Sequence, residues 1–208
     1  MALLSSSQTI VRYQAGSIKD EKIMETIQAA LIKNAMPEVQ EEYQEMMVGW
    51  VPFEKPYDPN FKIHPYIYGT DFVFSLRIDK KTVPAKALAQ KISVAVQAKC
   101  EATGREFLSK NEKADIKEIV LEKLILQVPF VPAIHEVHWN YESGSVMFFS
   151  NNKAANELFE TLFIASFERK IFQLFPYALA AGSINQATID MEVLDQLTPS
   201  TIGIGGAV

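Results

Sequence analysis

Two histidines and a set of carboxylates are the residues of this chain whose types could support metal or acid–base chemistry. His135 and His138 are separated by two residues in a segment that alternates apolar and polar side chains. Successive side chains of a strand point to opposite faces, so these two imidazoles would not converge on one metal ion. We therefore expect hydrogen-bonded structural histidines and no metal site.

Other catalytic signatures are weak. The sequence contains no Walker-type loop and no Gly-x-Ser-x-Gly elbow. Its single cysteine, Cys100, falls on the same helical stripe as Leu88, Ile92 and Val96, which favours a buried, unreactive thiol. We expect no catalytic residue, no cofactor and no enzymatic activity. A metal-dependent exonuclease is the weakest alternative, because carboxylates distant in sequence can still converge in space.

Composition indicates an ordinary globular protein. The 208 residues are 48% hydrophobic and 22% charged, which excludes wholesale disorder and fibrous classes. A single cysteine cannot form an internal disulfide and fits a reducing compartment. No apolar run approaches the roughly 18 residues that a membrane span requires. We expect a cytoplasmic protein without a membrane partner.

Charge is unevenly distributed along the chain. The net charge is −5, yet residues 80–123 contain ten Lys/Arg against six Asp/Glu, whereas the remainder contains ten against nineteen. A polyanion responds to the field within a Debye length, about 8 Å at physiological salt. An acidic chain with a basic segment can therefore bind a phosphate backbone. The alternative is that this segment is simply two helices with solvated lysine faces.

Hydrophobic periodicity predicts an α+β fold in which amphipathic helices pack on mixed or antiparallel sheets. The predicted order is β-α-α-β-α-α-β-β-α-β, with strands at 9–14, 71–79, 134–140, 145–149 and 172–179, and helices at 20–36, 38–47, 84–103, 110–128 and 151–167. Ser109 and Glu112 form the sequence pattern of a capping box at the start of one helix. Residues 51–64 are rich in proline and predict a loop or an edge strand.

The domain prediction is a single α+β domain over 1–197, with two lobes at about 1–80 and 81–197 as an alternative, followed by a flexible tail at 198–208.

Four aromatic residues in or near the proline-rich region could stack on bases or on a partner. Packing against the core is the better interpretation of these side chains. They are Tyr57, Phe61, Tyr66 and Tyr68.

Several segments over about residues 45–165 together resemble one family, the bacterial recombination-associated protein RdgC. The Gly49-Trp50-Val51-Pro52 element is similar to its GWVP motif. The strand at 72–78, which runs into Lys80-Lys81 and Pro84, is similar to its apolar strand and charged turn. The stretch from Gly104-Arg105 to Leu121 resembles its basic segment, and His138-Trp139 its tryptophan hairpin.

The resemblance implies a non-enzymatic protein of the nucleoid. It implies a ring-shaped homodimer that encloses double-stranded DNA without sequence preference and restrains the recombinase RecA. A basic lining would then contact the phosphate backbone alone. Phe130 resembles a subunit-contact position of the family. The candidate DNA-binding residues are Lys80, Lys81, Lys86, Lys91, Lys99, Arg105, Lys110, Lys113 and Lys117.

Two departures from the family pattern define the main alternative. Val128 stands where the family has an arginine, and the family's basic C-terminal finger has no counterpart in this sequence. The alternative function is a protein-interaction module of the same fold that has lost DNA binding.

Overall fold

The structure of the protein is a computed structural model that describes residues 5–16, 22–37, 45–184 and 196. It has the predicted α+β architecture. The elements in chain order are β1 (Val11–Ala15), α1 (Ile23–Lys33), β2 (Met46–Pro52), β3 (Ile67–Tyr68), β4 (Asp71–Lys81), α2 (Ala85–Thr103), α3 (Lys110–Gln127), β5 (Phe130–Asn140), β6 (Ser145–Phe148), α4 (Lys153–Phe167), β7 (Ile171–Gln173) and α5 (Pro176–Ile184).

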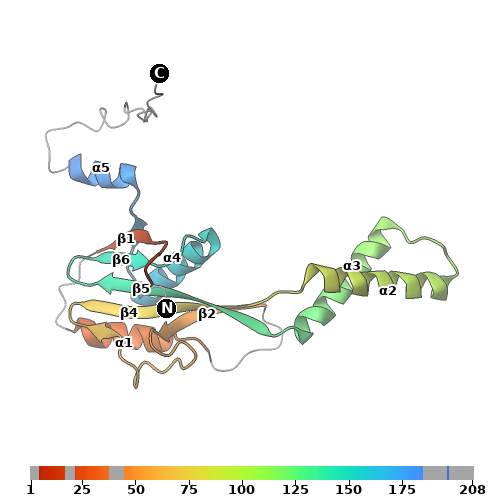
Figure 1. The fold of residues 1–208 in the computed structure, drawn as a ribbon, viewed down its shortest axis with the longest axis horizontal. Helices are drawn as coiled ribbons and strands as arrows, with labels where there is room; N and C mark the ends of the chain where they lie inside the picture. The colour runs from red at the N-terminus through yellow and green to blue at the C-terminus, as the bar shows by residue number, and fades with distance from the viewer. Residues whose placement is uncertain (1–4, 17–21, 38–44, 185–195, 197–208) are drawn as a thin grey trace.

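One antiparallel sheet organises the molecule. Its strand order is β2-β4-β5-β6-β1-β7, and the short β3 pairs with β4. Strands from both sides of residue 80 belong to this sheet, so the two halves of the chain share one core. We call the sheet together with α1 and α4 the body (Figure 1).

Alternation within β4 explains how the body forms. Phe72, Phe74 and Leu76 are fully buried and point to the face that α1 and α4 cover. The two helices bury residues at i, i+4 and i+8: Ile23, Ile27 and Leu31 on α1, and Phe159, Phe163 and Phe167 on α4. This matching of strand and helix periods creates a single apolar core between sheet and helices.

Aromatic rings dominate that core. Trp50 of β2 lies edge-on to Phe74 at a centroid distance of 5.1 Å and donates a hydrogen bond from Nε1 to Ser166 Oγ at 2.8 Å. Phe148 stacks on Phe159 at 4.4 Å. Such ring pairs add to the stabilisation from apolar burial, by about 0.5–1.5 kcal/mol each. The core therefore holds β2 and β6 firmly against α4.

A second region, which we call the arm, comprises residues 82–129 and contains α2 and α3. The paired strands β4 and β5 run from Asp71↔Asn140 to Lys81↔Phe130, and the helical hairpin follows from their far ends. Figure 1 shows the arm projecting from the body as a separate finger. Side chains of α2 and α3 therefore meet each other and solvent.

Three predictions about elements are wrong in part. The acidic helix predicted at 38–47 is contradicted where it overlaps β2, which begins at Met46, while residues 38–44 lie outside the described part of the chain. The strand predicted at 172–179 is reduced to β7, and α5 replaces its second half. The predicted order also lacks β3. The tail at 198–208 lies outside the described residues.

Candidate nucleic-acid interface

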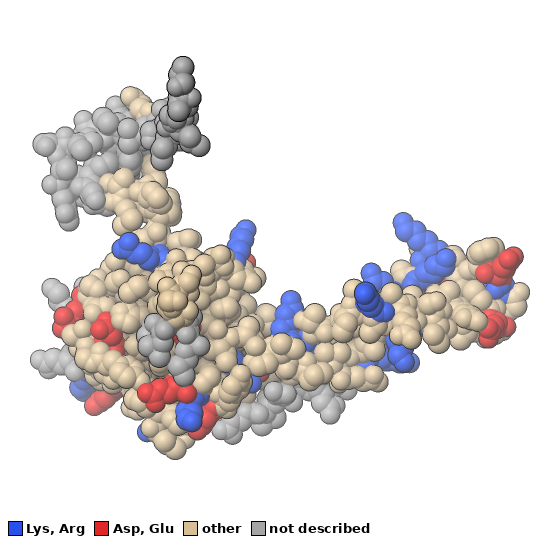
Figure 2. All heavy atoms as spheres, viewed as in Figure 1, with Lys and Arg blue, Asp and Glu red and all other residues tan. Residues whose placement is uncertain are grey.

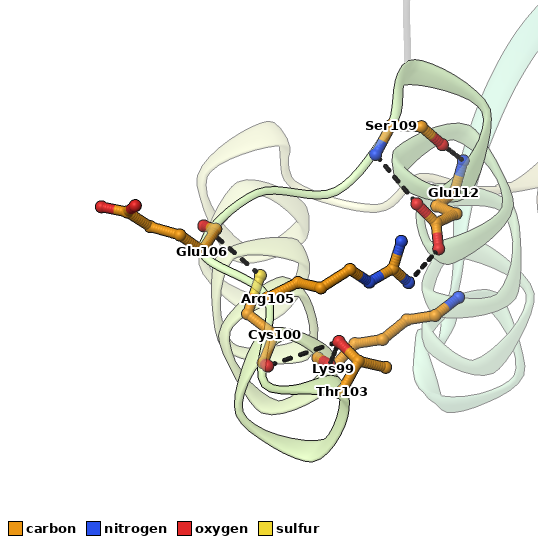
Figure 3. Close-up of polar contacts among 7 residues, drawn as sticks. All are labelled: Lys99, Cys100, Thr103, Arg105, Glu106, Ser109 and Glu112. Carbon is orange, nitrogen blue, oxygen red and sulfur yellow. Dashed lines mark hydrogen bonds and ion pairs between the residues drawn. The ribbon is translucent and has the colours of Figure 1, made fainter.

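The arm is a helical hairpin with clear start and stop signals. Pro84 precedes α2, and Gly104 ends that helix in a left-handed conformation with φ 63°. Ser109 begins α3 with the predicted capping box: its hydroxyl accepts from the Glu112 backbone N–H, and the Glu112 carboxylate accepts from the Ser109 N–H at 2.9 Å (Figure 3). These local signals end α2 and begin α3, and the two helices pack against each other in the hairpin.

An ion pair joins the loop to the cap. Arg105 donates a hydrogen bond to Glu112 Oε1 at 2.7 Å (Figure 3). The Ser109 backbone N–H, followed by Arg105, lowers the pKa of Glu112 to about 2. The Glu112 carboxylate therefore stays ionised at pH values well below its ordinary pKa. Arg105, one of the candidate DNA-binding residues, has a carboxylate partner within the arm.

The hairpin buries little apolar surface. No residue of α2 is buried, and α3 buries only Ile116. The predicted apolar stripe of α2 exists, but its members are only half-buried because α3 alone covers them. Cys100 on that stripe is half-buried too, with its Sγ 3.8 Å from the Glu106 carbonyl oxygen.

Most of the candidate DNA-binding lysines reach solvent. Lys99 of α2 is half-buried. The exposed lysines come from the end of β4, from α2 and from α3. The exposed ones are Lys80, Lys86, Lys91, Lys110, Lys113 and Lys117. The structure therefore exposes six of the eight candidate lysines, and Arg105 is exposed as well although it is paired with Glu112.

Lys81 has a different environment. Its side chain is only 8% exposed, and its ammonium group lies over the Phe130 ring, 4.9 Å from the centroid. Phe130 also packs against the small cluster formed by Met36, Met47 and Val51. In this conformation Lys81 and Phe130 stabilise the root of the arm, where β4 and β5 leave the body.

The two helices of the arm differ in charge. Helix α2 carries three lysines and one glutamate, whereas α3 carries four lysines and four acidic residues. Figure 2 shows blue side chains along the middle of the arm and red ones gathered near its tip. The net positive charge of the arm helices therefore lies on α2, because the lysines and acidic residues of α3 balance.

The histidines occupy separate environments. His135 packs its ring against Phe148 at 5.6 Å, and burial lowers its pKa. The Nε2 of His138 lies 3.2 Å from Asp71 Oδ1. Among the residues that the structure describes, no three His, Cys, Asp or Glu side chains converge as metal ligands.

The aromatic residues near the proline-rich loop divide into two kinds. Phe61 and Tyr66 are buried in the core, as the packing interpretation predicts. Tyr57 is exposed and lies over the Arg77 guanidinium, 5.4 Å from the ring centroid, while the Tyr68 hydroxyl donates to Glu54. These two residues lie on the body and are not part of the arm.

Sequence reasoning missed the exposed apolar side chains of the arm. Val94, Phe107 and Ile119 are all largely exposed, and Phe107 reaches 75%. Helical periodicity reveals an apolar stripe but does not reveal whether anything covers it. In the described part of the chain, no helix is both long and apolar enough to cross a membrane.

Comparison with known proteins adds no relative: no protein family matches the chain, and no curated protein is significantly similar to it.

Proposed function

We propose that the protein is a non-enzymatic DNA-binding protein that contacts the backbone of double-stranded DNA through its arm. The observation that carries this proposal is the placement of exposed lysines on a helical finger that projects from the body and carries a net positive charge, although the net charge of the whole chain is −5. Such a finger can lie along a duplex without the body approaching the phosphates. The local field near α2 is positive although the whole chain is negative.

Backbone contacts of this kind would be independent of sequence. Each lysine that neutralises a phosphate releases condensed counterions, so affinity falls steeply with salt. Side chains that read base edges, such as a bidentate arginine, are not needed for this mode. The one arginine of the arm, Arg105, is paired with Glu112. The arm thus has the composition of a backbone binder.

The proposal includes a homodimer. A single arm contacts one side of a duplex, and two arms related by a twofold axis could surround it as a ring. Phe130 at the root of the arm is the proposed subunit-contact residue, and it retains exposed surface. The proposed role of such a ring on the nucleoid is to occupy duplex DNA and thereby restrain the recombinase RecA.

The direct test is a fluorescence-anisotropy titration of a random-sequence duplex at several salt concentrations. The variant Lys110→Gln/Lys113→Gln/Lys117→Gln removes three exposed cations of α3. We expect uniformly weaker binding across sequences and a log–log salt slope reduced by up to about 3, roughly one per lost phosphate contact. A matched control, Lys33→Gln/Lys62→Gln/Lys170→Gln, removes three exposed lysines of the body.

The two triple variants distinguish binding through the arm from binding that depends on overall charge. Equal losses in the two triple variants would mean that overall charge, and not the arm, governs binding. No binding by the parent chain even at low salt would reject DNA binding altogether.

A second candidate function is a protein-interaction module. The specific observation in its favour is the exposed apolar surface of the arm, which includes Val94, Phe107 and Leu126. This function predicts a stable oligomer or partner complex without any shift of duplex DNA. Light scattering combined with the anisotropy titration distinguishes the two functions.

A further inference from the structure

An apolar groove bordered by positive charge lies between the two helices of the arm. Its volume is about 310 Å³, and Lys91 of α2 and Lys123 of α3 supply the charge. We call it the arm groove. Its other lining residues are Val94, Ala95 and Ala98 of α2 and Val120, Leu124 and Gln127 of α3.

The arm groove is accessible to an occupant. Val94 is 61% exposed, and both groove lysines are exposed as well. Removing apolar side chains from water is favourable, so the groove favours an apolar occupant. Its two cations favour carboxylates beside the apolar contacts. The matching ligand is therefore a helix face that combines apolar and acidic side chains.

Helix α3 carries such a face. Four of its residues follow one another at i, i+3, i+4 and i+7 and so form one stripe along the helix. The two carboxylates of the stripe are exposed, the two apolar side chains are half-buried, and all four line a surface cavity of about 510 Å³. We call these residues the acidic stripe: Glu118, Leu121, Glu122 and Ile125.

The charges of the two surfaces are available for intermolecular contacts. Among the described residues, neither the two groove lysines nor the two stripe glutamates take part in an ion pair. A stripe that entered a groove would bring lysines against glutamates. Contact of groove with groove, or of stripe with stripe, would bring like charges together. The charge pattern therefore favours the mixed contact and opposes the two symmetric ones.

The occupant of the groove must come from another copy of the chain. At about 100° per residue, the acidic stripe and the part of α3 that lines the groove, around Val120 and Leu124, lie on roughly opposite sides of the helix. A stripe therefore cannot enter the groove of its own arm. Because the two surfaces differ, a bound pair still offers one groove and one stripe, and repetition of the contact gives a ring or a chain.

We propose that the acidic stripe of one copy binds in the arm groove of a second copy. The stripe residues Leu121 and Ile125 supply the apolar contacts, and the groove lysines pair with the stripe glutamates. The arm projects from the body, so both surfaces lie outside the packed core (Figure 1). This contact is distinct from the proposed twofold contact at Phe130. It is measured without DNA, so it and DNA binding can fail separately.

A charge exchange tests the contact. Lys91→Glu/Lys123→Glu makes both surfaces acidic, and Glu118→Lys/Glu122→Lys makes both basic. We expect each variant to self-associate at least about tenfold more weakly than the parent chain in sedimentation equilibrium, because like charges then meet. An equimolar mixture of the two variants should restore the association, because the groove of each then matches the stripe of the other.

The matched control is Lys86→Glu/Lys110→Glu. It makes the same change of net charge at exposed lysines of α2 and α3 that line neither surface, and it should associate as the parent chain does. Three results would overturn the proposal. They are a parent chain that is monomeric at every concentration, an equal loss in the control, and a mixture of the two charge variants that stays dissociated.

Cysteine crosslinking tests whether different surfaces meet. In the full chain with Cys100→Ser, one variant carries Ala98→Cys in the arm groove and another carries Leu121→Cys in the acidic stripe. With a short bismaleimide, the mixture should give a crosslinked pair, whereas either variant alone should crosslink far less. Ala89→Cys, at an exposed alanine of α2 outside the groove, replaces Ala98→Cys in the control. Equal crosslinking by the control, or by one variant alone, would contradict the mixed contact.

Discussion

The body and the arm differ in how they use apolar residues. In the body, Trp50, Trp139 and Phe159 are completely buried among other rings. In the arm, two helices totalling 37 residues bury only Ile116. The body is therefore stabilised by its own core, whereas the arm is held by one seam between its helices and by its capping residues. The side chains of the arm are therefore accessible to other molecules.

Removal of a large core ring is expected to have the largest effect. Trp50→Ala deletes ring contacts to Phe74, Phe159 and Phe167 and leaves the Ser166 hydroxyl without its indole partner. We expect a loss of about 3–5 kcal/mol in the free energy of unfolding, measured by urea denaturation with circular dichroism.

The matched change in the arm is Phe107→Ala. Because that ring is exposed, its removal should change the same free energy by less than about 0.5 kcal/mol. A comparable loss from both substitutions would contradict the contrast between a packed body and an open arm.

Two glycine substitutions test the same contrast between body and arm, with smaller expected losses of stability than Trp50→Ala. A Cβ at Gly49 would lie 2.5 Å from the Met36 Cα, so Gly49→Ala must displace backbone and should cost about 1–3 kcal/mol of stability. Gly104 has open space but a φ of 63°, so Gly104→Ala should cost about 1 kcal/mol.

The two glycine substitutions should also destabilise different regions of the protein. Amide hydrogen exchange should show that Gly49→Ala accelerates exchange throughout the body, whereas Gly104→Ala accelerates it in α2 and α3 alone. Faster exchange of the body in the Gly104 variant would show that arm and body unfold as one unit.

Loss of the capping box should have an effect similar in size to that of Gly104→Ala. Ser109→Ala removes the hydroxyl that accepts from the Glu112 N–H and should cost about 1 kcal/mol of arm stability. Because folding lowers the pKa of Glu112 from 4.5 to about 2, its contribution is complete above pH 4.5 and is lost as the pH falls toward 2.

The pH dependence is measured by following helix content between pH 5 and 2. Glu112→Gln should remove part of the acid-induced loss of helix. Glu106→Gln, at the same end of the arm but outside the capping box, serves as the control (Figure 3). Identical acid profiles for the parent chain and Glu112→Gln would contradict the assigned role of the carboxylate.

Much of the body follows from local sequence patterns. Alternation from Phe72 to Ile78 predicts β4, and the Ser109–Glu112 pattern predicts the start of α3; both are confirmed. Strand pairing decides one of the elements that were predicted wrongly, and α5 is a second such element that no local pattern indicated. Met46–Pro52 forms a strand because it lies antiparallel to β4, and Pro176–Ile184 is a helix although its apolar residues follow no clear period.

The candidate site could be predicted only as a set of residues. Lys80 and Lys81 are indistinguishable in sequence, yet they point to opposite faces of β4, and only Lys80 is exposed. The stripe on α2 predicts an apolar face, but the sequence does not reveal that the helix projects from the body. Lys123 was not among the candidates, and its position beside residues of α2 follows only from how α2 and α3 pack together.

The most direct test of the central claim compares the lysines of the two regions in one experiment. Lysine acetylation of the parent chain, with and without duplex DNA, is quantified by mass spectrometry. The account predicts protection by DNA of Lys86, Lys91, Lys110, Lys113 and Lys117, all on the arm, and unchanged reactivity of Lys33, Lys62 and Lys170 on the body. Protection of the body lysines with the arm lysines unchanged would contradict it.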